Sequence, residues 1–115
     1  PPLYSSSAAS DVYKRQSLFG SETIDAIFEE QARGIDMVLG TPVRFGLVYN
    51  LANPDDLAGI TSGRVCYWGG WGGSVVVNDL DNRITMAYMM NRMQDGLVGN
   101  LTSTALIEAL GAITA

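Results

Sequence analysis

The pattern of apolar and polar positions predicts a helix, then several short strands, then a second helix. Residues 21–33 place Ile24, Ile27 and Phe28 at the i, i+3, i+4 spacing of an amphipathic helix. Ser21 suits the N-cap of that helix, because its hydroxyl can accept a hydrogen bond from a first-turn N–H. The first element is therefore expected to be a helix that buries one apolar stripe.

A strand is expected over residues 43–51, directly after Pro42, which disfavours helix on either side of it. Gly46 inside this strand indicates a bulge or a close approach of another backbone. The Asn-Pro-Asp-Asp sequence of residues 53–56 is typical of a turn. The strand is thus expected to end before residue 53.

Three further strands are expected over residues 64–68, 74–78 and 83–90, with a turn at 79–82, as in an antiparallel hairpin or meander. Their nearly continuous apolar runs favour a sheet covered on both faces. A loop over 91–99 then precedes a helix over 100–112, with Asn100 as its cap. The expected core residues are Ile24, Ile27, Phe28, Phe45, Leu47, Val75, Val77, Met86, Tyr88, Leu106 and Leu110.

Composition limits the kinds of function that are open to the chain. Its 115 residues form one domain at most, and 47% are hydrophobic while 17% are charged. A net charge of −5 disfavours a nucleic-acid partner, since the chain has no basic stripe to neutralise phosphates. The single cysteine, Cys66, allows neither an intrachain disulfide nor a cysteine-based zinc site, and there is no histidine. No metal, cofactor or membrane span is expected.

The first sixteen residues are expected to be foreign to the domain. Residues 6–16, SSAASDVYKRQ, match the translation of a transposase-type sequencing-library adapter, and eleven matching residues make coincidence a poor explanation. The alternative is a disordered native N-terminus. We therefore expect residues 1–16 to be an artefact and residues 17–115 to be the domain, truncated at the junction.

The glycine cluster of residues 65–74, VCYWGGWGGS, is the stretch most suggestive of chemistry. It is not a phosphate-binding P-loop, because Ser74 follows the last glycine where that motif needs lysine. It also lacks the third glycine of GxGxxG. Two interpretations stay open from the residues alone. The glycines either let backbone segments pack closely, or let a strand edge approach a ligand and direct its N–H groups at a developing negative charge.

The segments GIDMVLGTPVRFGLVYNL and VCYWGGWGGSVVVNDLDNRITMAYMMNRM resemble the C-terminal half of β-lactamase-related serine hydrolases. That group contains class C β-lactamases, penicillin-binding DD-peptidases and carboxylesterases, and the esterase-like members are the most similar. The resemblance covers nearly all of residues 17–115. It implies an α+β fold, the C-terminal part of the β-lactamase/DD-peptidase-like fold, in which helices flank an antiparallel sheet.

The resemblance also implies a set of site residues. Trp68, Gly69 and Gly70 match the W-G-G form of the family's third motif, which lies on a strand facing the nucleophile. The residue that follows, Trp71, would contribute its backbone N–H to the oxyanion hole. Asn91 matches a position where some members contact substrate with an asparagine, although a turn role is equally open. The implied site therefore binds substrate through residues 68–70 and Asn91.

Two motifs of the family are absent from the chain. S-x-x-K cannot occur, because Asp11 lies three residues before Lys14, which is the only lysine. No tyrosine is followed two residues later by asparagine, so Y-x-N cannot occur either. In the family both motifs lie upstream of the segments matched here. The chain alone is therefore expected to be inactive, and its partner to be the missing N-terminal half of the same domain.

The implied parent is a serine hydrolase that acts on a small ester or amide through an acyl-serine intermediate. The W-G-G motif favours an esterase, since it lacks the lysine that would attract a β-lactam carboxylate. The alternatives are a non-catalytic relative that only binds ligands and an independent small structural or interaction domain. The sequence leaves the compartment open between cytoplasm, periplasm and secretion, with the cytoplasm favoured.

Overall fold

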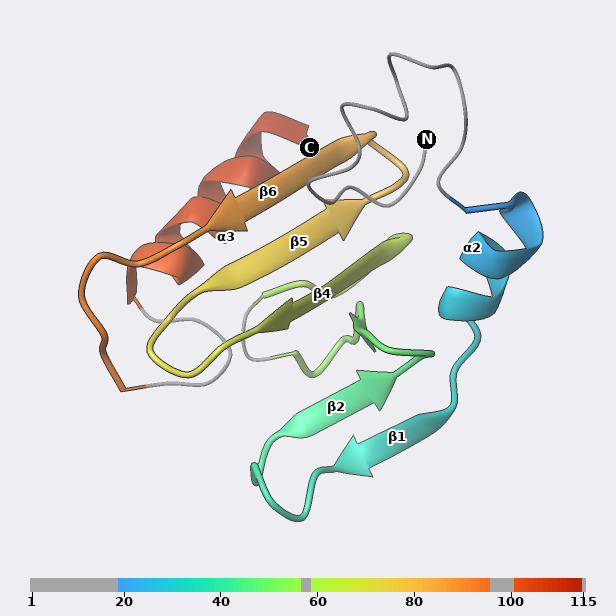
Figure 1. Cartoon of the computed structure of the whole chain (residues 1–115), viewed down its shortest axis with the longest axis horizontal. Coiled ribbons are helices and arrows are strands. Elements are labelled where there is room, and N and C mark those ends of the chain that lie inside the picture. The colour runs from blue at the N-terminus through green and yellow to red at the C-terminus, as the bar shows by residue number, and fades with distance from the viewer. Residues whose placement is uncertain (1–18, 57–58, 96–100, 115) are drawn as a thin grey trace.

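A computed structural model describes residues 19–56, 59–95 and 101–114, which form one antiparallel sheet with one helix before it and one helix after it in sequence (Figure 1). The helices are α2, Ser21–Ile27, and α3, Leu101–Thr114. The strands are β1 (Ala32–Ile35), β2 (Pro42–Phe45), β3 (Asn50–Leu51), β4 (Val65–Gly69), β5 (Val75–Asp79) and β6 (Ile84–Tyr88). Each strand pairs antiparallel with the next in sequence, so the described sheet is a meander in the order β1 to β6. The fold is therefore α+β, as expected.

The predicted helix over 21–33 is wrong in its second half. Helix α2 ends at Ile27, and residues 32–35 instead form β1, whose Gly34 lies opposite Val43 of β2. The N–H of Gln31 already donates to the carbonyl oxygen of Phe45 at 2.7 Å. Strand pairing thus outweighs a helical tendency that loses its apolar stripe after Phe28. Ser21 is inside the helix rather than its cap, and Gly20 holds the N-cap position.

The predicted strand over 43–51 is two strands joined by a tight turn. Strand β2 ends at Phe45, and the N–H of Gly46 donates to the carbonyl oxygen of Tyr49 at 2.9 Å. Val48 adopts a φ of 79° in this turn, which leaves its side chain exposed. Leu47, expected in the core, is 49% exposed for the same reason.

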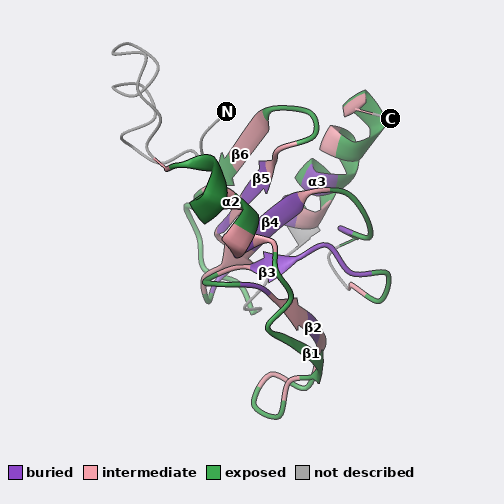
Figure 2. Ribbon diagram, turned by 90° about the vertical axis from the view of Figure 1, so that its right-hand side faces the viewer, coloured by how far each residue is buried: buried purple, intermediate pink, exposed green. Residues whose placement is uncertain are grey.

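The buried residues form one cluster on each face of the sheet. Successive residues of β4 point to opposite faces, so Val65 and Tyr67 join the cluster covered by Ile107 of α3, and Cys66 joins the one covered by Ile27 of α2. Figure 2 shows the buried strands β4 and β5 with α2 and α3 beside them. The expectation that both faces are covered is confirmed for Cys66 and Tyr67, which are fully buried on opposite faces of β4.

Several other expected core residues are confirmed and one more is wrong. Val75 and Val77 are buried. Met86 and Tyr88 pack against the cluster that contains Ile107 of α3, and Phe28 packs against the cluster that contains Ile27 of α2. Partly buried positions are occupied by Ile24, Phe45 and Leu110. Leu106 is 39% exposed, because α3 buries Ser103 and Ile107 instead. The apolar residues of α3 surround the helix, so their spacing does not identify the buried face.

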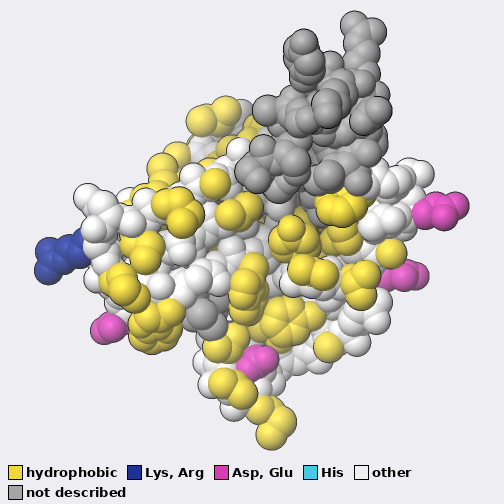
Figure 3. All heavy atoms as spheres, in the orientation of Figure 1, with side chains coloured by type: hydrophobic (Ala, Val, Ile, Leu, Met, Phe, Trp, Pro, Cys, Tyr) yellow, Lys and Arg dark blue, Asp and Glu magenta, His cyan; other side chains and the backbone are white. Residues whose placement is uncertain are grey.

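Apolar side chains also spread over the sheet face that is turned away from α3 (Figure 3).

Within the described part of the chain, neither helix has the length and apolar character that a membrane crossing requires. The Asn100 cap and the interpretation of residues 1–16 both lie outside the described residues.

Charged side chains connect the α2 region to the sheet. Arg44 of β2 lies 2.7 Å from the carboxylate of Glu30 and donates to the carbonyl oxygen of Ala52 at 3.1 Å. Arg64, just before β4, pairs with Asp25 of α2 and lies 4.9 Å above the ring of Phe28. These exposed or half-exposed pairs orient the helix and contribute little stability each.

Gly46 tests how closely α2 approaches the sheet. A Cβ at Gly46 would lie 2.1 Å from the carbonyl oxygen of Ile27 and 3.0 Å from a methyl group of Leu51. We expect Gly46→Ala to lower the free energy of unfolding by about 1–3 kcal/mol or more, since backbone must move. Gly111→Ala in α3 is the control, because nothing lies within 4 Å of its added Cβ.

Urea denaturation of both variants measures this difference. Gly111→Ala is expected to raise stability by about 0.5–1 kcal/mol, because alanine costs less entropy in a helix. Equal midpoints for Gly46→Ala and the unmodified chain would contradict the close approach of Ile27.

Candidate functional site

The glycine cluster forms the end of β4 and the turn into β5. Gly69 lies opposite Val75, and the N–H of Gly70 donates to the carbonyl oxygen of Ser74 at 2.9 Å. The N–H of Gly73 donates to the carbonyl oxygen of Gly70 at 3.3 Å, which closes a turn over residues 70–73. We call residues 70–73 the glycine turn.

The glycine turn requires glycine at two of its positions. Gly72 and Gly73 have φ values of 103° and 120°, which other residues rarely adopt. Gly72 is the third residue of the turn, where a positive φ is typical of a type II turn. Trp71 is the second residue and is 60% exposed. The exposed Trp71 is therefore followed directly by two glycines whose backbone conformation disfavours other residues.

The three residues of the W-G-G motif lie together beside a pocket of about 410 Å³. Trp68 is half-buried, and its ring packs on Phe45 with the ring centres 5.4 Å apart. The lining is Tyr49, Trp68, Gly69, Gly70, Ser74, Val75, Val76 and Met89, with no charged side chain among these residues. Such a pocket fits an uncharged group of small-molecule size.

The edge of β4 beside the motif is open within the described residues. Strand β3 pairs only with Cys66 and Tyr67, and it stops before the motif. The N–H of Ala52 donates to the carbonyl oxygen of Val65 on the β3 side at 3.2 Å, whereas Gly70 bonds on the β5 side. Since backbone groups alternate along a strand, those of Gly69 point to the open edge.

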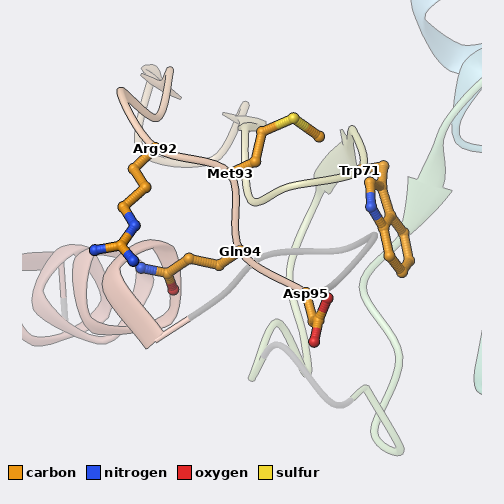
Figure 4. A pocket seen from close by; sticks show the side chains of 5 residues that line it. All are labelled: Trp71, Arg92, Met93, Gln94 and Asp95. Atoms are coloured by element: carbon orange, nitrogen blue, oxygen red, sulfur yellow. The ribbon is translucent and has the colours of Figure 1, made fainter.

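The remaining predicted residues lie in two different places. Trp71 lines a second, shallow pocket of about 530 Å³ with residues 92–95 (Figure 4). Asn91 is exposed and is among the lining residues of neither pocket, and its contact with substrate stays a prediction. Arg92 forms no ion pair with another described residue.

Sequence reasoning missed Tyr49, Ser74 and Met89 as lining residues of the first pocket. The alternation of side chains on β5 could have placed Ser74 and Val76 on the same face as Trp68. Tyr49 could not be found this way, because the turn before β3 was not predicted.

A buried polar network supports β4 directly behind the motif. The Tyr67 hydroxyl donates to the carboxylate of Asp56 and accepts a hydrogen bond from Asn50 Nδ2 at 2.7 Å. Asn50 Oδ1 accepts from the backbone N–H of Arg44 at 3.0 Å, and Asp56 accepts from the N–H of Ile60 at 2.9 Å. Burial, and then the hydrogen bond to Asp56, raise the pKa of Tyr67. Its hydroxyl therefore stays protonated and holds the loop before β4 in place.

The thiol of Cys66 is chemically quiet in this environment. Burial raises its pKa to about 11, against a weak hydrogen bond from Asn78 Nδ2 at 3.8 Å that lowers it. Burial also raises the pKa of Tyr49. Because nucleophilic attack by cysteine needs the thiolate, Cys66 supplies no nucleophile near neutral pH.

The geometry agrees with what comparisons with known proteins show. The sequence profile of the β-lactamase family matches residues 9–110. The chain therefore belongs to the β-lactamase family. The match begins inside the segment attributed above to an adapter, and that attribution stays a prediction.

A solved structure, EstA from Arthrobacter nitroguajacolicus Rue61a, is similar over 87% of this chain, with a TM-score of 0.66 and 27% sequence identity. The chain spans 27% of the length of EstA. No match is found among curated protein sequences.

We expect Tyr67→Phe to lower the free energy of unfolding by about 1–3 kcal/mol, because Asp56 and Asn50 would each lose a buried partner. Tyr88→Phe is the matched control, since the Tyr88 hydroxyl makes no hydrogen bond to another described residue. Its effect should stay within about 0.5 kcal/mol. Chemical denaturation of both variants gives the comparison, and equal losses would argue against the network.

Proposed function

We propose that this chain forms part of a serine hydrolase that cleaves a small-molecule ester, or an amide, through an acyl-serine intermediate. Its contribution is one wall of the acyl-transfer site, built from Trp68, Gly69, Gly70 and Trp71. A serine from elsewhere in the protein would attack the carbonyl carbon, and the alcohol or amine would leave with a proton. Water would then release the acid and regenerate the serine.

The observation that carries this proposal is the open edge of β4. The carbonyl oxygen of Gly70 points into the turn, where it accepts from the N–H of Gly73. Because C=O and N–H lie on opposite sides of a trans peptide, the Trp71 N–H of the same peptide is expected to point away from the turn. The Trp71 N–H makes no hydrogen bond to another described residue. A donor with this orientation can stabilise the negative charge that develops on a carbonyl oxygen. The second donor of the oxyanion hole would be the N–H of the nucleophilic serine.

The uncharged pocket supports an ester substrate over a β-lactam. Its described lining residues offer the Tyr49 and Ser74 hydroxyl groups and apolar surface, and none of them is a cation that could pair with the carboxylate that β-lactams carry. Asn91 is not among the lining residues, and we propose it as a contact for a part of the substrate that extends beyond this pocket.

The rest of the site is proposed to come from the N-terminal part of the domain. The chain contains neither S-x-x-K nor Y-x-N, and it spans 27% of the length of EstA. Large apolar side chains are exposed around the motif, with Trp71 at 60%, Met93 at 61% and Met89 at 75%. An exposed apolar cluster of this kind is typical of an interface. We propose that this surface packs against the part of the domain that carries the nucleophile.

The chain by itself is expected to react with no fluorophosphonate probe, because its sequence contains neither S-x-x-K nor Y-x-N to supply an activated serine. Incubation of the purified 115-residue chain with such a probe, followed by intact mass measurement, tests this. A covalent adduct on any serine of the chain would overturn the assignment of the nucleophile to another segment.

Trp71→Pro tests the oxyanion donor in the complete protein. Proline removes the N–H, and it suits the second position of a type II turn, so the fold should persist. We expect kcat for a 4-nitrophenyl ester to fall about 10²- to 10³-fold, as when one oxyanion donor is lost. Trp71→Ala, which keeps the N–H, is the control and should change mainly KM.

Three results would count against the proposal. Equal kcat values for the proline and alanine variants would remove Trp71 from the oxyanion hole. Binding of the ester without hydrolysis by the unmodified protein would favour the non-catalytic relative. Cleavage of a chromogenic cephalosporin but not of the ester would reverse the choice of substrate.

A further inference from the structure

The glycine turn is held from outside by the segment that follows β6. The N–H of Gln94 donates to the carbonyl oxygen of Gly72 at 3.0 Å. This bond joins residues that are distant in sequence and lie beyond the paired ends of β5 and β6. It fixes one peptide group of the turn, the one that directly follows the Trp71–Gly72 peptide.

Two methionine side chains pack against the same glycine. A Cβ at Gly72 would lie 3.0 Å from Met90 Cε, 3.1 Å from Met93 Cε and 3.1 Å from Met93 Cγ. Gly72 is accordingly buried, although Trp71 beside it is exposed. Methionine is suited to this contact because its unbranched side chain adapts to irregular surfaces.

These contacts fix both neighbours of Trp71. Gly70 is held by its bond to Ser74, and Gly72 is held by Gln94 and the two methionines. The plane of the Gly70–Trp71 peptide sets the direction of the Trp71 N–H, and that plane depends on where Gly70 and Gly72 lie. A displacement of about 1 Å at an acyl-transfer site can cost about a hundredfold in rate.

We infer that Met93, assisted by Met90, is a positioning residue that holds the glycine turn so that the Trp71 N–H points at the reacting carbonyl oxygen. This inference rests on the proposed function. Met93 is more exposed than Met90, with 61% of its surface accessible. Two atoms of the Met93 side chain, Cγ and Cε, pack against Gly72. Its role is distinct from substrate binding, since it acts through the backbone of the turn.

Amide hydrogen exchange on the 115-residue chain tests the positioning directly. In Met93→Ala, the amides of Gly73 and Gln94 should exchange at least about tenfold faster, because the turn opens locally. The amides of the β5–β6 ladder should keep their rates, which separates a local effect from general destabilisation. Met93→Leu, which preserves the volume, should restore slow exchange.

Met37→Ala is the matched control, because Met37 is 99% exposed in the turn between β1 and β2. It should leave the exchange of the Gly73 and Gln94 amides unchanged. The inference is overturned if Met93→Ala leaves these amides at their original rates. It is also overturned if Met37→Ala, or the β5–β6 ladder in Met93→Ala, accelerates to the same extent.

Kinetics of the complete protein separates this inference from the proposed function. Met93→Ala should lower kcat for a 4-nitrophenyl ester about 10- to 100-fold while KM stays within about twofold, since the N–H acts in the transition state. An unchanged kcat despite faster exchange would show that Met93 holds the turn without positioning the Trp71 N–H for catalysis, and would overturn the inference. If the unmodified protein hydrolyses no ester, the proposed function fails, and the exchange result still decides whether Met93 holds the turn.

Discussion

The two-residue period of β4 sets both the packing of the sheet and the position of its open edge. Side chains alternate between faces, so Val65 and Tyr67 enter the cluster beneath α3 while Cys66 enters the cluster beneath α2. Backbone groups alternate between edges, so Gly70 bonds to β5 while its neighbours point away from it. A shift of the strand by one residue would exchange both sets at once, burying Trp68 and removing Tyr67 from its partners. The register of β4 is therefore strongly constrained.

The buried hydrogen-bond network behind β4 constrains the register of this strand in addition to apolar packing. Tyr67 has its hydroxyl between Asp56 and Asn50, and these come from the loop and the short strand that precede β4. In the observed register of β4, the Tyr67 hydroxyl has hydrogen bonds with both Asp56 and Asn50. A shifted register would separate these three side chains and leave buried polar groups without partners. Apolar packing alone would tolerate several similar arrangements, whereas hydrogen bonds of fixed geometry select one.

The strands of the second half of the chain could be predicted because their signals are local. Val75 and Val77 lie between the glycine turn and the turn after Asp79, and strands β4, β5 and β6 lie within about two residues of the expected ranges. The first half was harder, because residues 29–35 have no apolar period and their conformation is decided by pairing with β2. A partner strand distant from a segment can override that segment's own preference.

The site was predictable in part for the same reason. The W-G-G residues are consecutive, so the sequence alone keeps them together, and the structure adds a pocket beside them. Tyr49 and Met89 reach that pocket from other strands, and their approach follows from sheet order rather than from any local motif. Asn91 illustrates the reverse case, since proximity in sequence to β6 does not bring its side chain into the pocket lining.

The meander has a consequence for how the sheet assembles. Every strand of the described sheet pairs with its neighbour in sequence, so each ladder can form by closing a single hairpin or loop. Closing short loops costs less chain entropy than joining segments from opposite ends of a protein, and topologies rich in local contacts fold faster. The sheet can therefore grow strand by strand, in the order in which its strands leave the ribosome.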